Sequence, residues 1–145
     1  MEQHLLQAKV ELYVHLVWAT MNRAERLKGD FERAIYRCVE DQARDLGCVV
    51  LAIGGRPDHV HMVLSIPPNY CVSRVMGFLK GKSAIQMFRK YAGLRKKYYG
   101  QHYWSRGYAV TTVGLDEEMI RKYVRWQEKK DREEDAAAQL QLQLE

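Results

Sequence analysis

The fold of this chain can be worked out from one stretch, residues 54–68, which reads GGRPDHVHMVLSIPP. Apolar residues alternate with His59 and His61 there, as in a β-strand with one face in a core. Residues two apart in a strand point to the same face, so both imidazoles are expected on one side. The opposite, core-facing set is Val60, Met62, Leu64 and Ile66. Two neutral imidazoles side by side can supply half of the ligands of a divalent metal ion.

The composition fits one globular domain in a reducing compartment. The chain has 145 residues, 47% of them hydrophobic, which is enough to bury a core. Its three cysteines show no CxxC spacing, which argues against a disulfide framework or a zinc ribbon and favours the cytoplasm. We expect no signal segment and no membrane span. The net charge of +5 favours a polyanionic partner without proving one.

Three further strands are expected from hydrophobic periodicity. They cover residues 10–18, 48–53 and 104–114, while 22–29 reads as a polar, basic loop and 54–58 as a turn. The first strand alternates cleanly, with Leu16 and Trp18 on one face and His15 on the other. His15 could therefore sit beside the metal-binding face, although we favour its interpretation as an ordinary polar strand residue.

Three helices are expected between and after these strands. The first begins at Asp30 as its N-terminal cap and is closed by Gly47. The second begins near Val72, with a bend or break at Gly81, and the third begins at Asp116. The order strand–helix–strand–strand–helix–strand predicts an α+β fold of the ferredoxin-like (RRM-like) class. Such a fold has an antiparallel sheet with helices on one face, here with an additional C-terminal helix.

The last helix carries residues that could complete a site. Tyr123 and Gln127 are four residues apart, so their side chains are neighbours. If this helix crosses the face that bears His59 and His61, the site becomes two histidines and a carboxamide beside a phenol. An open divalent ion can polarise a phosphoryl oxygen, and a nearby cation would ease deprotonation of the tyrosine. On an apolar helix face, however, a tyrosine is usually packing.

A basic region and two single arginines are candidate DNA contacts. Basic side chains mixed with tyrosines suit single-stranded nucleic acid, through phosphate pairing and base stacking. Such charge runs are more often solvated surfaces. The candidates in this region are Lys80, Lys82, Arg89, Lys90, Arg95, Lys96 and Lys97. Arg56 precedes the histidine strand and could touch either phosphate or only the turn.

These residues together resemble a known family. The run PDHVH at 57–61, followed by two prolines, resembles the His-hydrophobic-His (HUH) signature of the small single-tyrosine transposases of bacterial and archaeal insertion sequences, the IS200-like family. The resemblance reaches to about Asp131. It includes YVHLVWAT at 13–20, LKGKSA at 79–84, WSRGY at 104–108, TVG at 112–114 and YVRWQ at 123–127.

The resemblance implies a specific chemistry. His59 and His61 match the metal-binding histidines, Gln127 the third ligand and Tyr123 the nucleophile, with Mg²⁺ or Mn²⁺ as the metal. The family binds hairpins in single-stranded DNA at element ends. It cleaves one strand through a 5′-phosphotyrosine and rejoins strands during excision and insertion, without a nucleotide cofactor. Members act as homodimers in which one subunit's tyrosine helix can complete the other's site. The basic residue expected near Met21 is displaced to Arg23, another candidate DNA contact.

The resemblance also divides the chain. Residues 1–131 form the transposase domain, and 132–145 form a charged, Ala-, Gln- and Leu-rich tail that is expected to be loose or to pack on a partner.

Three alternatives remain open at this stage. The first is a domesticated relative that cleaves repeated palindromes, which genomic flanks would separate from a mobile element. The second is a non-enzymatic ferredoxin-like nucleic-acid binder. RRM-type sheets use exposed aromatic residues where this strand has histidines, which speaks against it. The third is a metallohydrolase without a covalent step, which a trapped protein–DNA adduct would exclude.

Overall fold

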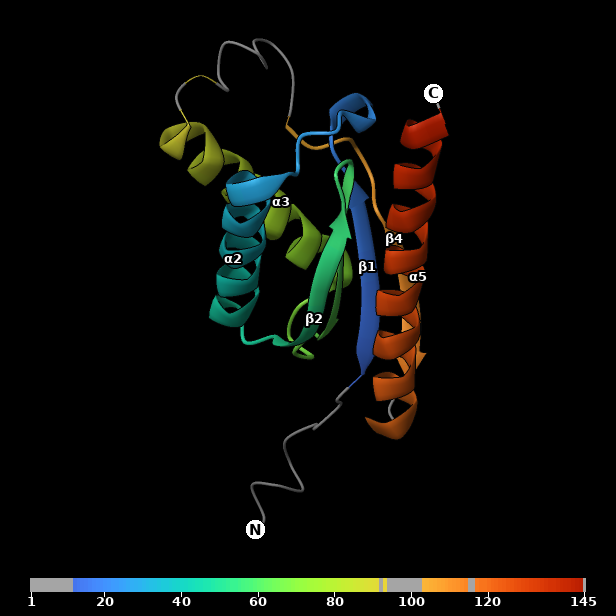
Figure 1. Ribbon diagram of the computed structural model, residues 1–145. Coiled ribbons are helices and arrows are strands. Elements are labelled where there is room, and N and C mark those ends of the chain that lie inside the picture. The colour runs from blue at the N-terminus through green and yellow to red at the C-terminus, as the bar shows by residue number, and fades with distance from the viewer. Residues whose placement is uncertain (1–11, 92, 94–102, 115–116, 145) are drawn as a thin grey trace, which may run out of the picture.

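The computed structural model describes residues 12–91, 93, 103–114 and 117–144 (Figure 1). Its sheet has four antiparallel strands in the spatial order β2-β3-β1-β4. In chain order the strands are β1 (Tyr13–Ala19), β2 (Val49–Arg56), β3 (His59–Ser65) and β4 (Ala109–Gly114). This order, with β1 and β3 in the centre, confirms the predicted ferredoxin-like fold.

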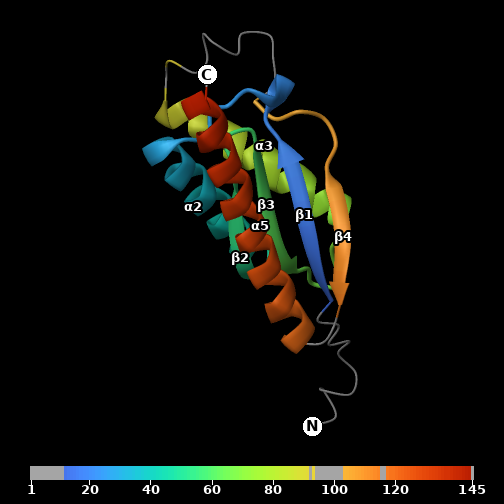
Figure 2. The same ribbon diagram turned by 45° about the vertical axis from the view of Figure 1, so that its right-hand side comes forward.

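Helices cover both faces of the sheet. Helices α2 (Gly29–Asp45) and α3 (Val72–Lys90) lie on one side, which we call the inner face (Figure 1). Helix α5 (Glu117–Leu144) lies obliquely across the other side, the outer face (Figure 2). The additional C-terminal helix therefore covers the face that the first two helices leave open.

The inner face is an apolar core. Leu16 and Met62 are fully buried there, on the two central strands. They belong to one hydrophobic cluster with Ile35 and Val39 of α2 and Leu79 of α3. Fully burying a side chain of this size contributes about 1.5–3 kcal/mol, so this layer supplies most of the stability of the fold. The alternation predicted for β1 and β3 is thus confirmed on the core side.

The predicted helix boundaries hold at one end of α2 and fail at the other. Asp30 is not the N-terminal cap: Lys28 is the extended residue before the helix, and no side chain caps it. Asp30 lies inside the first turn and pairs there with Arg33. At the other end, Gly47 has a φ of +86°, and its N–H donates to the carbonyl of Arg44 at 2.8 Å. Gly47 closes the helix as predicted, because glycine adopts a positive φ without strain.

The predicted turn at 54–58 is shorter than expected. Strand β2 continues to Arg56, and its last residues pair with β3 as Gly54↔His61, Gly55↔Val60 and Arg56↔His59. Only Pro57 and Asp58 remain as the turn. A Cβ atom at Gly55 would lie 2.2 Å from the carbonyl oxygen of His59, so the glycine is needed for this close strand pairing. A glycine pair that reads as a turn signal is here part of a strand.

Two other local predictions are wrong. Helix α3 passes through Gly81 without a break, and a Cβ atom there would meet nothing within 4 Å. Strand β4 begins at Ala109, whereas Trp104 forms only an isolated bridge with Thr20. The predicted loop at 22–29 overlaps a short 3₁₀ helix, Met21–Arg23.

Helix α5 crosses the predicted domain boundary without interruption. It continues from residue 131 to Leu144, so the expected loose tail is helical here. Leu140, Leu142 and Leu144 are exposed on it. The division at 131 stays a prediction. Within the part of the chain that the structure describes, none of the helices is both apolar and long enough to cross a membrane.

Candidate active site

Three histidines line the outer face beneath α5. His15 lies on β1, and His59 and His61 lie on β3. The ring centroids of His15 and His61 are 5.4 Å apart, and those of His59 and His61 are 6.3 Å apart. His15 and His61 are buried, whereas His59 is half-buried. Both histidines of the HVH stretch thus leave the sheet on the side opposite the apolar core, as the strand period predicts.

The His61 ring fits over a position without a side chain. Gly54 is its cross-strand partner on β2. A Cβ atom at Gly54 would lie 3.1 Å from Cε1 and 3.3 Å from Nε2 of His61. Any side chain at residue 54 would therefore crowd the imidazole, which explains why the strand carries a glycine at this point.

His59 is oriented by its neighbour in the turn. Its Nδ1 lies 2.9 Å from Oδ1 of Asp58, and Oδ2 of Asp58 pairs with Nε of Arg23 at 3.2 Å. Because a carboxylate only accepts hydrogen bonds, Nδ1 of His59 carries the proton and Nε2 keeps its lone pair. A carboxylate behind an imidazole is the usual support of a metal-binding histidine.

Asp131 connects His61 to Gln127. One carboxylate oxygen makes a short contact with Nε2 of His61, and the other accepts a hydrogen bond of 3.2 Å from the side-chain amide of Gln127. Gln127 is 9% exposed, so the amide is held in place. Its nitrogen is the donor, which leaves the carbonyl oxygen available as a ligand. Nδ1 of His61 is buried and has no hydrogen-bond partner within the part of the chain that the structure describes.

Tyr123 reaches the same face one turn earlier on α5. Its hydroxyl oxygen lies 2.6 Å from Nδ1 of His15. Burial raises the pKa of Tyr123, which keeps the phenol protonated at neutral pH. Burial, and next the nearby His61, lower the pKa of His15 to about 4, so this imidazole is neutral. The structure therefore brings Tyr123, Gln127 and His61 onto the outer face of their own chain.

Sequence reasoning missed Asp131 and favoured the wrong alternative for His15. Tyr123, Gln127 and Asp131 are spaced by four, which places all three on one side of α5. Extending the spacing by one step predicts Asp131. For His15, the structure supports the alternative of a position beside the predicted metal-binding face, since its ring contacts those of His61 and Tyr123.

Comparison with known proteins agrees with this arrangement. Residues 8–127 match the family described as "Transposase IS200 like". The chain belongs to the IS200-like transposase family. The transposase for insertion sequence element IS200 of Salmonella typhimurium is 32% identical over 131 residues, which is 90% of this chain and 86% of that relative. The ISDra2 transposase TnpA of Deinococcus radiodurans is 32% identical over 122 residues, covering 83% and 87% of the two chains.

Solved structures share the architecture of this transposase. A crystal structure of a proposed transposase from Deinococcus radiodurans aligns with a TM-score of 0.67 and 27% identity, over 85% of this chain and 94% of that one. A REP-associated tyrosine transposase bound to a REP hairpin aligns with a TM-score of 0.57 and 15% identity, over 79% and 62%. The second likeness shows the fold alone. Family membership assigns the chain to proteins that move DNA by transposition.

The candidate DNA contacts of the transposase have varied surroundings. Arg56 pairs with Asp135 at 3.0 Å and with Glu134 at 3.8 Å. Its guanidinium group is therefore already paired with carboxylates of α5. Lys80 donates to the carbonyls of Ser105 at 2.7 Å and Gly107 at 3.0 Å. Burial lowers the pKa of Lys80, and these contacts point to a structural role. Arg23 is held by Asp58, as described above.

The other predicted contacts lie on or after α3. Lys82 lies over the ring of Phe78, and Lys90 over that of Tyr91, each 5.8 Å from the ring centroid. Arg89 is exposed in the last turn of the helix. Arg95, Lys96 and Lys97 lie outside the described residues. All these DNA contacts remain predictions.

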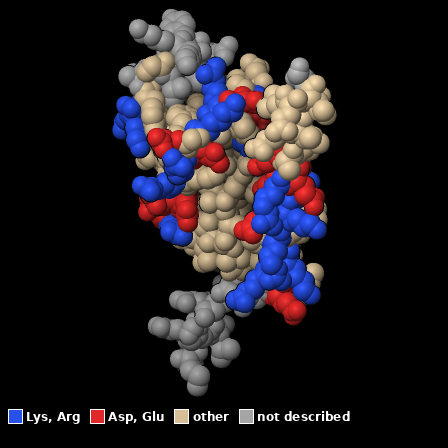
Figure 3. Space-filling view, in the orientation of Figure 1, with Lys and Arg blue, Asp and Glu red and all other residues tan. Residues whose placement is uncertain are grey.

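A basic surface surrounds Tyr123 on α5. Lys and Arg side chains gather over the N-terminal half of this helix, at the lower right of Figure 3. The exposed basic residues of this half are Arg121, Lys122, Arg125, Lys129 and Lys130, and Arg132 follows them. Trp126 is 53% exposed beside them, and its ring lies 5.7 Å from that of Tyr123. Sequence analysis did not single out this surface.

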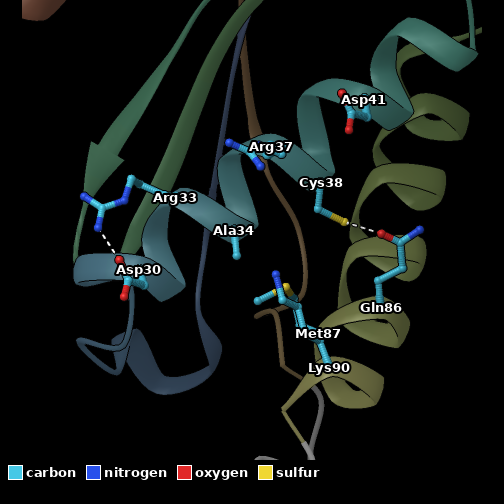
Figure 4. Close-up of a pocket in the computed structure, with 9 residues that line it drawn as sticks. All are labelled: Asp30, Arg33, Ala34, Arg37, Cys38, Asp41, Gln86, Met87 and Lys90. Carbon is cyan, nitrogen blue, oxygen red and sulfur yellow. Dashed lines mark hydrogen bonds and ion pairs between the residues drawn. The ribbon is translucent and has the colours of Figure 1, made fainter.

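A cavity of about 370 Å³ lies away from the histidines, between α2 and α3 (Figure 4). Acidic and basic side chains alternate around it, and Arg33 pairs with Asp30 on its rim. Also in its lining, the Cys38 thiol donates to the side-chain carbonyl of Gln86 at 2.8 Å. With both charge signs and no histidine in its lining, this cavity is not part of the candidate active site.

Proposed function

We propose that this transposase cleaves and rejoins single-stranded DNA through Tyr123, with a divalent metal ion held by His59, His61 and Gln127. One observation carries the proposal. Helix α5 lies on the outer face of the sheet, so that the Tyr123 hydroxyl reaches His15 and the Gln127 amide is joined to His61 through Asp131. The family supports DNA transposition, and this geometry supports the division of roles among the side chains.

We propose Mg²⁺ or Mn²⁺ as the metal, as the family resemblance implies. Nε2 of His59 and the carbonyl oxygen of Gln127 are both left without a proton by the hydrogen bonds described above. His61 contributes an imidazole whose Nδ1 has no hydrogen-bond partner among the described residues and whose Nε2 contacts Asp131, so binding a metal through Nε2 would require this carboxylate to move. Among the described residues, no three His, Cys, Asp or Glu side chains form a complete metal-binding group. The metal site therefore depends on the Gln127 amide, a ligand type that Mg²⁺ and Mn²⁺ accept.

The chemistry follows from the nucleophile. The Tyr123 oxygen attacks the phosphorus, the bond from phosphorus to the 3′-oxygen breaks, and a 5′-phosphotyrosine forms. The phenol loses its proton to solvent, and the leaving 3′-oxygen takes one up. A bound divalent ion polarises the phosphoryl oxygen and stabilises the charge that develops. Attack by a 3′-hydroxyl on the phosphotyrosine reverses the step, so rejoining needs no nucleotide cofactor.

The proposed substrate is a hairpin in single-stranded DNA at an element end. The structural neighbour bound to a REP hairpin supports a hairpin ligand, and the net charge of +5 supports a polyanion. Trp126 and the basic residues of α5 offer the aromatic and cationic groups that single strands bind. We further propose a homodimer, as the family resemblance implies. The free cysteines Cys38, Cys48 and Cys71 support a cytoplasmic site of action.

A covalent adduct tests the proposal. The purified chain is incubated with labelled hairpin DNA and Mg²⁺ or Mn²⁺, and the protein–DNA adduct is quantified and mapped. We expect an adduct at Tyr123, none with Tyr123→Phe despite unchanged hairpin binding, and loss of metal-stimulated cleavage with His59→Ala. Efficient cleavage by Tyr123→Phe would refute the assignment of Tyr123 as the nucleophile. Unchanged activity of His59→Ala at titrated metal concentrations would refute that ligand.

A further inference from the structure

His15 lies between the proposed nucleophile and a proposed metal ligand. Its Nδ1 is 2.6 Å from the Tyr123 hydroxyl oxygen. Its ring makes edge contacts with the rings of Tyr123 and His61, with centroid distances of 5.4 Å in both cases. His15 is only 7% exposed, so water competes little for this hydrogen bond.

The backbone around His15 is well supported. It lies in the middle of β1, a central strand, and is paired on one side with Val63 of β3 and on the other with Thr111 of β4. Among the described residues its buried Nε2 has no hydrogen-bond partner, so the polar contact of the ring is the one that Nδ1 makes with Tyr123. His15 is therefore held in a defined position on the outer face of the sheet.

Tyr123 by itself has more freedom. Its phenol ends several bonds away from the backbone of α5, and it is half-buried. Its ring packs at a tilt on Trp126, which is itself exposed. Within the described residues, the hydrogen bond to His15 is the one recorded for the Tyr123 hydroxyl. Loss of this bond would leave the hydroxyl free to move relative to the histidines.

We propose that His15 is a positioning residue that holds the Tyr123 hydroxyl beside His61 on the chain's own sheet. This inference rests on the proposed function, because it needs Tyr123 to be the nucleophile. Holding a reacting atom near its attack position removes part of the entropic barrier, and a displacement of about 1 Å can cost about 100-fold in rate.

Two substitutions separate positioning from packing. His15→Leu keeps a branched side chain of similar size but removes the acceptor. His15→Asn keeps an acceptor oxygen on Cγ, where histidine carries Nδ1. We expect His15→Leu to slow single-turnover adduct formation about 10- to 100-fold, with hairpin affinity within about twofold of wild type. We expect His15→Asn to recover most of the rate.

The contact can also be observed without DNA. In protein labelled with ¹⁵N in its histidines, Tyr123→Phe should shift the Nδ1 resonance of His15, because it removes the hydroxyl that is the hydrogen-bond partner of this nitrogen among the described residues. An unshifted Nδ1 resonance would overturn the inference, and this measurement needs neither activity nor a folded His15→Leu variant.

The controls distinguish the inference from the proposed function. If wild type forms no adduct, or if Tyr123→Phe still cleaves, the proposed function fails. If wild type forms the adduct and a folded His15→Leu variant forms it equally fast, only the role of His15 fails. Equal slowing by His15→Leu and His15→Asn would likewise overturn positioning through Nδ1 and assign His15 to packing.

Discussion

The two faces of the sheet share the same strands but are covered in different ways. The inner face meets α2 and α3 through apolar side chains such as Leu16 and Met62, which are fully buried. The outer face meets α5 through polar pairs, including Tyr123 with His15 and Asp131 with His61. Many interchangeable apolar contacts stabilise a fold, whereas a few specific polar contacts place reacting groups. In this transposase, stability and the candidate chemistry lie on opposite sides of one sheet.

The largest difference between the faces should appear when neighbouring residues of β3 are changed. His61→Ala removes a proposed ligand on the outer face and should reduce metal-dependent cleavage at least about 1,000-fold, equivalent to about 4 kcal/mol of barrier. Met62→Leu, on the inner face, conserves volume and should cost less than about 1.5 kcal/mol of stability, with cleavage retained. Single-turnover assays and thermal unfolding measure both. Full cleavage activity of His61→Ala would show that this outer-face histidine is not needed for the reaction.

Stability should depend on the inner face. Leu16 is fully buried and pairs in register with Val110 of β4, which is 47% exposed. Leu16→Ala should lower the free energy of unfolding by about 2–5 kcal/mol, since it leaves a cavity in the core. The matched change Val110→Ala should cost less than about 1 kcal/mol, because that side chain is already in water. Chemical denaturation checks the pair, and equal losses would contradict the difference in burial between the centre of the sheet and its edge strand.

Thiol reactivity should report the same layering. Burial raises the pKa of Cys48 to about 11, from an ordinary value near 9, whereas hydrogen bonding from Ser73 lowers the pKa of exposed Cys71. A raised thiol pKa means that less thiolate is present at pH 8. For Cys48, an increase in pKa of about 2 lowers the thiolate fraction about 100-fold. We expect Cys71 to be alkylated at least about 100-fold faster than Cys48, as followed by peptide mass spectrometry. The difference should vanish in denaturant. Rapid labelling of Cys48 in the folded chain would show that the inner layer is open.

The smallest effect should come from the ion pairs that join α5 to β2. Arg56 is 3.0 Å from Asp135, but the acid is more than half exposed, so the pair is worth about 0–1 kcal/mol. Arg56→Ala should lower the free energy of unfolding by no more than that, and 1 M NaCl should remove the difference. Lys129→Ala, which loses only a pair within α5, is the control. A loss above about 2 kcal/mol would show that polar contacts hold the outer layer as firmly as apolar ones hold the core.

Sequence periodicity predicted side-chain positions well where they depend on a single helix or strand. Alternation in β1 and β3 separates core residues from the histidines, and a spacing of four places Tyr123 beside Gln127 on α5. Residues that usually mark turns or helix ends were less reliable predictors of where an element begins or ends. Gly54 and Gly55 read as a turn but lie in β2, since strand pairing uses their lack of side chains. Asp30 read as a cap but lies inside α2.

The sequence by itself determined the ferredoxin-like order of elements, the two-sided strands and the identity of His59, His61, Tyr123 and Gln127 as candidates. Tertiary structure alone decided that α5 crosses the outer face, and with it the contacts of Tyr123 with His15 and of Asp131 with His61. The physical reason is the distance along the chain over which each signal acts. Periodicity indicates which side of its own helix or strand a residue occupies. The contact between His15 and Tyr123 joins residues 108 positions apart, so it depends on how helix α5 docks onto the folded sheet.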